Sequence, residues 1–141
     1  MILLDTNVIS EALKPNGALA VSAWIDDQAI ETLYLSTITL AELRFGIAVM
    51  TNGKRKNNLR QQLDERVMPI FAGRILSFNA NCVDTYAVLR TRARAAGKGI
   101  DTADAYIAAV AAAHNFAIAT RDTSPFEAAG LEVINPWELF K

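Results

Sequence analysis

Short apolar runs alternate with longer helical segments along the chain, and this alternation is the strongest constraint on the fold. The apolar runs are 1–4, 33–36, 74–78, 116–119 and 131–134. Each run has the length of a buried strand rather than of a helix. Strands that alternate with helices favour parallel pairing with helical cover. The sequence therefore predicts an α/β fold with a mainly parallel five-stranded sheet, flanked by helices on both faces.

Turn and capping residues mark where the predicted helices begin and end. Thr39 stands three residues before Glu42, the spacing of a capping box. Glycines follow two amphipathic segments, as helix-terminating residues do. Ser124 with Pro125 behind it predicts the cap of a short helix. The other predicted helices cover 8–13, 18–27, 39–50, 54–72, 81–96 and 100–114. No repeat or linker divides the chain, so we expect one domain over residues 1–141.

Composition narrows the class of protein. The 141 residues suffice for one domain with a hydrophobic core. A net charge of −1 gives no global basic field for nucleic acid, so any such contact requires a local patch. The single Cys82 excludes an internal disulfide framework. No signal peptide and no apolar run of about 20 residues is present. We expect a soluble cytoplasmic protein without membrane contact.

Two aspartates follow predicted strands directly. Asp5 ends the first strand, and Asp122 follows the fourth by three residues. The carboxyl ends of parallel strands share one edge, where open α/β sheets place their ligands. The alternative is that each aspartate caps the following helix. Ser124 already offers a cap for the short helix, which weakens the capping role for Asp122.

Glu42 lies in the first turn of the helix predicted after the second strand. It is either the capping-box partner of Thr39 or a functional carboxylate. Ile38, Phe45 and Val49 place an apolar face around it. A carboxylate on a buried face needs a partner.

Asp104 lies in the first turn of an alanine-rich helix with few other polar residues. A helix dipole favours an anion there. Asp101 is already available for that role, so Asp104 is in surplus and becomes a functional candidate.

Four carboxylates at one sheet edge raise each other's pKa values unless a cation neutralises them. Oxygen ligands favour Mg²⁺ or Mn²⁺.

At these motifs the chain resembles the PIN-domain ribonucleases. The motifs are 4–7 (LDTN), 36–43 (STITLAEL), 104–109 (DAYIAA) and 119–122 (ATRD). With the Asn135-Pro136-Trp137 tail, they are similar to the VapC toxins of type II toxin–antitoxin modules, in the branch that includes FitB. The resemblance covers essentially the whole chain.

The resemblance implies a Mg²⁺- or Mn²⁺-dependent endoribonuclease that cleaves structured RNA such as tRNA or rRNA. It implies a homodimer, a cognate VapB-like antitoxin that inhibits the toxin, and operator DNA bound only through the antitoxin. By motif, the metal-site acids are Asp5, Glu42, Asp104 and Asp122, and the polar supports are Asn7 and Thr120. A second class remains as the alternative, a catalytically quiet partner of a DNA-binding antitoxin in operator repression.

RNA binding requires positive charge near the acids. The candidates are Arg44, Arg121, Lys54, Arg55 and Lys56. A solvated helix face is the alternative for the 54–56 cluster.

For dimerisation, the apolar stripe of the 54–72 helix and the small-residue face of the 103–113 helix are candidates. Both faces are equally compatible with packing inside the domain.

Overall fold

The computed structural model describes residues 1–138, and among these a wholly parallel sheet of five strands confirms the predicted fold class. The strands follow the spatial order β3-β2-β1-β4-β5. Central β1 pairs with β2 on one side and β4 on the other. The strand bounds are β1 (Ile2–Leu4), β2 (Leu33–Ser36), β3 (Ile75–Leu76), β4 (Ala117–Ala119) and β5 (Val133–Ile134). The sheet thus places the end of β1 in the middle of the carboxyl edge.

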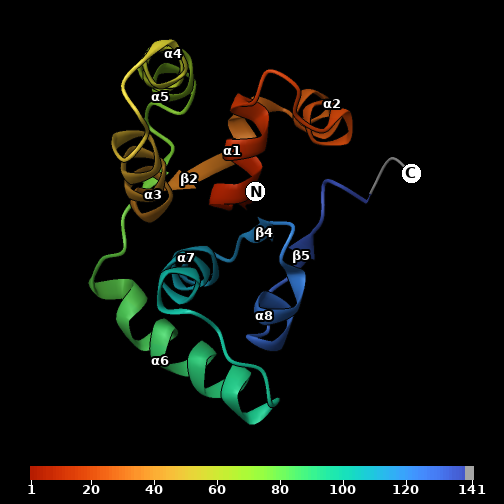
Figure 1. Ribbon diagram of the computed structural model, residues 1–141. Coiled ribbons are helices and arrows are strands. Elements are labelled where there is room, and N and C mark those ends of the chain that lie inside the picture. The colour runs from red at the N-terminus through yellow and green to blue at the C-terminus, as the bar shows by residue number, and fades with distance from the viewer. Residues whose placement is uncertain (139–141) are drawn as a thin grey trace.

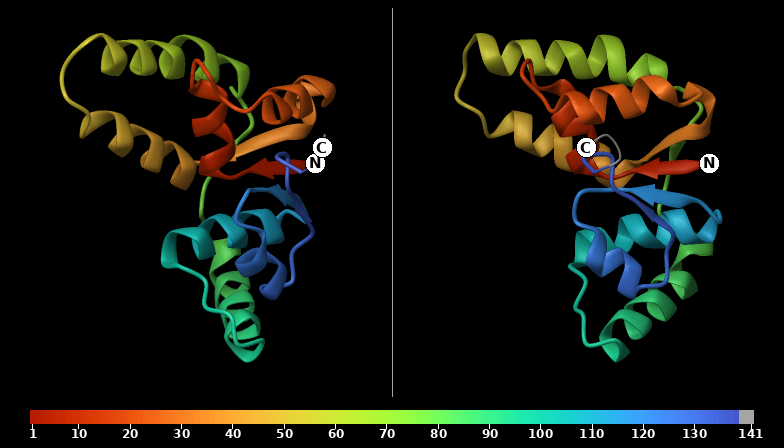
Figure 2. Two further views of the ribbon diagram at one scale, coloured as in Figure 1. Left: turned by 45° about the vertical axis from the view of Figure 1, so that its right-hand side comes forward. Right: turned by 90° about the vertical axis from the view of Figure 1, so that its right-hand side faces the viewer.

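Helices cover both faces of the sheet. Figures 1 and 2 show the N-terminal helices on one side and the C-terminal helices on the other, with the strands between them. The first group is α1 (Thr6–Leu13), α2 (Leu19–Asp27), α3 (Thr37–Ala48), α4 (Lys54–Gln62) and α5 (Met68–Ile70). The second group is α6 (Ala80–Ala95), α7 (Thr102–Ala113) and α8 (Thr123–Ala128).

Side-chain alternation along β1 separates the core into two halves. Leu3 packs with residues of α6, α7 and α8, whereas Leu4 packs with residues of α1, α2 and α3. Both leucines are fully buried. Successive side chains of a strand point to opposite faces, so both faces hold the strand in register. This double burial fixes the position of Asp5, the next residue.

The two faces considered for dimerisation are largely packed inside the domain, although Ile70 of the first face is 45% exposed. The predicted 54–72 helix consists of α4, a π-helical segment (Leu63–Val67) and α5. Its stripe residues Leu63 and Val67 are buried against the α1 side of the core. The small residues of α7 are likewise buried. Within residues 1–138, no helix is both long and apolar enough to span a membrane.

Candidate functional site

Asp5 both caps α1 and faces the carboxyl edge of the sheet. Its Oδ1 accepts the Thr6 N–H at 2.8 Å, and its Oδ2 accepts the Thr120 hydroxyl at 2.8 Å. Its side chain is almost wholly buried. The two readings of Asp5, cap and functional carboxylate, are therefore compatible, because each uses a different oxygen.

Thr120 and Asn7 connect the ends of β1 and β4. The Thr120 hydroxyl, which donates to Asp5, accepts the Asn7 Nδ2–H at 3.3 Å and the Asp122 N–H at 3.2 Å. Asn7 Oδ1 in turn accepts the Arg121 N–H at 3.4 Å. These bonds fix the orientation of the Asp5 carboxylate from the side of β4.

Glu42 reaches the site through threonine contacts that the sequence prediction did not include. Thr6 Oγ1 donates to Glu42 Oε1 at 2.6 Å and lies 3.2 Å from Thr39 Oγ1. The sequence offered two signals for these contacts. Thr6 follows Asp5 directly, and Thr39 stands one helical turn before Glu42.

The predicted capping box of α3 is wrong. Ser36 caps this helix, and its Oγ accepts the Thr39 N–H at 3.1 Å. The helix begins two residues earlier than predicted, so Glu42 lies in its second turn. The face around Glu42 is also exposed rather than buried, with Phe45 69% exposed. Ser36 is the last residue of β2 and accepts the Thr39 N–H, so Thr39 lies within the first turn and is not the cap.

The predicted cap of α8 is also wrong. Asp122 occupies the cap position, and Ser124 lies inside the helix. The Asp122 side chain makes no capping hydrogen bond. Its carboxylate is therefore not used by the helix end.

Asp104 lies in the first turn of α7, and Asp101 occupies the cap position as expected. Burial raises the pKa of Asp104 to about 6, and the charges of Asp5, Asp101, Glu42 and Asp122 add to this effect. Burial also raises the pKa of Asp5, against the hydrogen bonds from Thr120 and Thr6 that lower it. The four predicted acids thus share one electrostatic field.

Asp5, Glu42 and Asp104 line one pocket, which we call the acid pocket, whose lining also includes Arg121 and Trp137. Asp122 is not among its lining residues and acts on it through its charge. Within residues 1–138, no three acidic, histidine or cysteine side chains are close enough to hold a metal ion as they stand. Mg²⁺ usually keeps several waters and takes one or two carboxylates, so a finished cage is not required.

The predicted basic residues are distributed unevenly around the acid pocket. Arg121 lines it, but Arg44 is paired with Asp64 at 2.6 Å and does not. Lys56 donates to the Ala48 carbonyl and to Asn52. Lys54 and Arg55 also lie outside the acid pocket. The sequence prediction missed Lys14, which lines the pocket and pairs with Glu11 at 2.9 Å.

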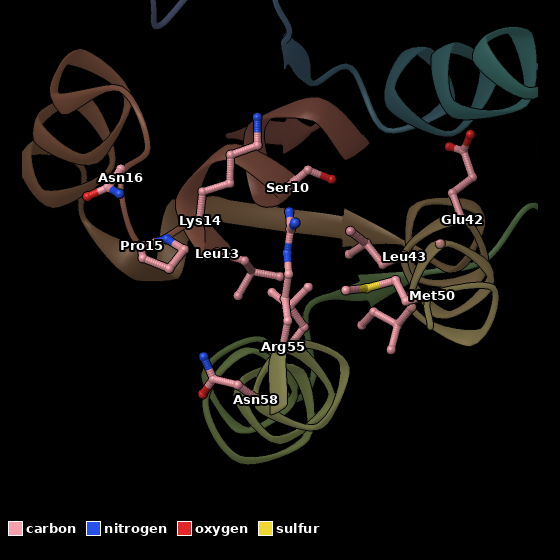
Figure 3. A pocket seen from close by; sticks show the side chains of 13 residues that line it. Ser10, Leu13, Lys14, Pro15, Asn16, Glu42, Leu43, Met50, Arg55 and Asn58 are labelled. Atoms are coloured by element: carbon pink, nitrogen blue, oxygen red, sulfur yellow. The ribbon is translucent and has the colours of Figure 1, made fainter. Parts of the chain in front are cut away.

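A second pocket adjoins the acid pocket and shares Glu42, Ser10 and Lys14 with it. Figure 3 shows Arg55 extending from α4 into the space between α1 and α3. We call this cavity the helical groove. Its apolar lining comes from Leu13, Leu43, Ile47, Met50 and Leu59. It was not anticipated, because its walls come from three helices that only the fold brings together.

A carboxylate-lined pocket lies at the carboxyl edge of the parallel sheet, as expected for a PIN domain. Comparison with known families agrees. Residues 2–131 match the family model described as PIN domain. The chain belongs to the PIN domain family.

Particular relatives resemble it over nearly their full length. It is 60% identical to the plasmid stability protein StbB of Pseudomonas syringae pv. tomato and 59% identical to VapC ribonuclease Y4jK of Sinorhizobium fredii, in each case over 98% of this chain and 99% of the relative. It is 52% identical to toxin FitB of Neisseria gonorrhoeae over 97% of this chain and 99% of FitB. A solved structure of FitAB bound to an IR36 DNA fragment contains a chain that matches this one with a TM-score of 0.94, at 50% identity, covering 100% of this chain and 99% of that one.

Proposed function

We propose that this chain is the toxin of a toxin–antitoxin pair and hydrolyses phosphodiester bonds within structured RNA at the acid pocket. The observation that carries the proposal is the gathering of Asp5, Glu42 and Asp104 at one pocket, with the pKa values of Asp5 and Asp104 raised. Such shifts cluster at functional sites. The resemblance to a VapC ribonuclease and to toxin FitB supports the same reaction class.

The acids fit a divalent cation, Mg²⁺ or Mn²⁺, by donor type and by charge. All four are hard oxygen donors, and their mutual repulsion is the kind that a cation relieves. We propose Asp5 and Asp104 as direct ligands, with Glu42 and Asp122 acting directly or through water. A bound divalent cation supplies an activated water at neutral pH and offsets charge on the phosphate.

The remaining polar residues orient the acids. The Thr120 hydroxyl holds Oδ2 of Asp5, and Asn7 holds Thr120. Thr6 donates to Glu42 and so sets the carboxylate of α3 toward the end of β1. The carboxylates of Asp5 and Glu42 are therefore restrained before substrate arrives, which reduces the reorganisation needed at the reaction step.

For partners, we propose a VapB-like antitoxin, a second copy of the chain, and operator DNA bound only through the antitoxin. The similarity to the FitAB–DNA structure supports this assignment. The helical groove is the proposed binding place of an antitoxin segment, because it has an apolar floor with polar side chains around it and shares Ser10, Lys14 and Glu42 with the acid pocket. We further propose that residues 1–141 form one domain.

The test uses purified protein and bacterial RNA. Wild-type chain should cleave bulk tRNA or rRNA in Mg²⁺, and Asp5→Asn and Asp104→Asn should abolish the cleavage. Asp84→Asn, the same change on the exposed surface of α6, is the matched control and should cleave normally. Undiminished cleavage by a folded Asp104→Asn variant would disprove the role of the acids. Sequencing the RNA ends after expression in a bacterial host identifies the bond that is cut.

A further inference from the structure

An arginine and a tryptophan form one wall of the acid pocket. The guanidinium carbon of Arg121 lies 5.3 Å from the centre of the Trp137 ring. Both residues line the pocket. At this distance a guanidinium and an indole attract each other as a cation–π pair.

The sheet register creates this pair from residues that are far apart in sequence. The Thr120 N–H donates to the Ile134 carbonyl at 2.9 Å, so the chain leaves β4 and β5 at the same level. The Asn135 Oδ1 accepts the Trp137 N–H at 3.0 Å and turns the second segment. Asn7 holds the Arg121 backbone from the other side. The cation–π pair therefore lies at the same edge of the sheet that carries Asp5.

The charge of Arg121 is available for a ligand. Within residues 1–138 its side chain makes no salt bridge, whereas Lys14, the other cation of the pocket, is paired with Glu11. A guanidinium lying over a ring still has N–H donors for another partner, because it carries five of them in a planar fork. That fork matches two oxygens of a phosphate.

We infer that Arg121 binds an RNA phosphate beside the bond to be cut and that Trp137 is its positioning residue; this inference rests on the proposed nuclease function. Four acids line the same pocket: Asp5, Glu11, Glu42 and Asp104. The charge of Arg121 contributes to lowering the pKa of Glu11, after the larger effects of Lys14 and the Ala18 N–H. Without the indole contact, the arginine would pair with one of these acids. The indole face gives the guanidinium a different resting place. Arg121 thus keeps its charge for a polyanion that the acids repel.

The experiment measures binding apart from cleavage. Fluorescein-labelled bulk tRNA is titrated in EDTA at several KCl concentrations with wild type, Arg121→Gln, Arg121→Lys, Trp137→Leu and Trp137→Phe. Arg94→Gln on α6, which contributes no residue to the pocket, is the matched control. Thermal unfolding of every variant checks the fold, because Trp137 also packs against the core.

Arg121→Gln should weaken binding roughly tenfold, the value of one charged hydrogen-bonded contact. It should also reduce the slope of log affinity against log salt by about 0.7 to 0.9, the share of one phosphate. Arg121→Lys should keep the slope but bind less tightly, because lysine lacks the planar N–H fork that binds two phosphate oxygens. In Mg²⁺, Arg121→Gln should raise KM more than it lowers kcat.

Trp137 is tested by its coupling to Arg121. Trp137→Leu should weaken binding severalfold, Trp137→Phe should restore most of the loss, and Trp137→Leu should have little further effect in the Arg121→Gln background. Equal losses from Trp137→Leu with and without Arg121 would show a structural role only and overturn the positioning claim. An unchanged salt slope in Arg121→Gln would overturn the phosphate contact.

The two proposals fail in distinguishable ways. Normal cleavage together with unchanged binding by Arg121→Gln removes the inference and leaves the nuclease function intact. If wild type does not cleave RNA and Arg121→Gln still lowers the salt slope, the phosphate contact stands and the nuclease assignment falls.

Discussion

Asp104→Asn should stabilise the fold at neutral pH while it removes activity. The pKa of Asp104 rises from 3.8 to about 6, first through burial and then through the charges of Asp5, Asp101, Glu42 and Asp122. Ionised Asp104 is therefore less favourable in the folded chain than in the unfolded chain. Asparagine has nearly the same shape and carries no charge, so the substitution removes this penalty.

The magnitude follows from the shift in pKa. About two pKa units correspond to roughly 3 kcal/mol of differential interaction. Asp104 is only half-buried, and solvent screening reduces this to about 1–2 kcal/mol. Well below pH 3.8 the carboxyl is protonated in both states, so no penalty exists. As pH rises from about 4 to about 6 the unfolded state ionises first, and wild type loses stability relative to the variant.

Urea unfolding in EDTA at pH 4, 5, 6, 7 and 8 measures this difference. The free energy of unfolding of Asp104→Asn should equal that of wild type near pH 4 and exceed it by about 1–2 kcal/mol at pH 8. Asp84→Asn, on the exposed surface of α6, should differ from wild type by less than about 0.5 kcal/mol. Equal stability of wild type and Asp104→Asn at every pH would refute the claim that burial and the neighbouring acids make ionised Asp104 unfavourable in the folded chain.

Two further predictions concern the same edge of the sheet. Thr120→Val should lower the free energy of unfolding by about 2 kcal/mol, because it leaves Oδ2 of buried Asp5 without its hydroxyl donor; urea unfolding measures the loss, and a loss below about 0.5 kcal/mol would contradict it. Millimolar Mg²⁺ should raise the Tm of wild type by binding the folded state, and should raise it much less in Asp104→Asn. An equal rise in both proteins would place the ion elsewhere.

Local sequence signals predicted the architecture because the strands are short and almost purely apolar. β2 was predicted with its observed bounds, and Gly73 and Gly97, which follow the helical segments ending near 72 and 96, have positive φ values. The errors lie at helix starts, where neighbouring polar residues compete for the cap. Ser36, the last residue of β2, caps α3 in place of Thr39. Asp122 takes the cap position of α8 in place of Ser124, although its side chain makes no capping hydrogen bond.

The sequence predicted only part of the site, for a different reason. Acids after strands are visible in the sequence, since the parallel sheet gathers all such ends at one edge. The environment of each acid depends on tertiary contacts. The Thr6 hydroxyl donates to Glu42, 36 positions further along the chain. Arg121 lies over the Trp137 ring only because β4 and β5 pair in one register. The spacing of residues within one helix does not predict such contacts.

The carboxylates of the acid pocket affect both the stability of the fold and the proposed reaction. Asp5 is buried with raised pKa although Thr120 and Thr6 both donate to it. A chain selected for stability alone would replace one of the acids by an amide, as the Asp104→Asn prediction states. The proposed cation explains why such unfavourable charges are retained, because the repulsion that weakens the free fold becomes attraction once positive charge is present. On this proposal, one set of side chains in the acid pocket determines both metal affinity and fold stability.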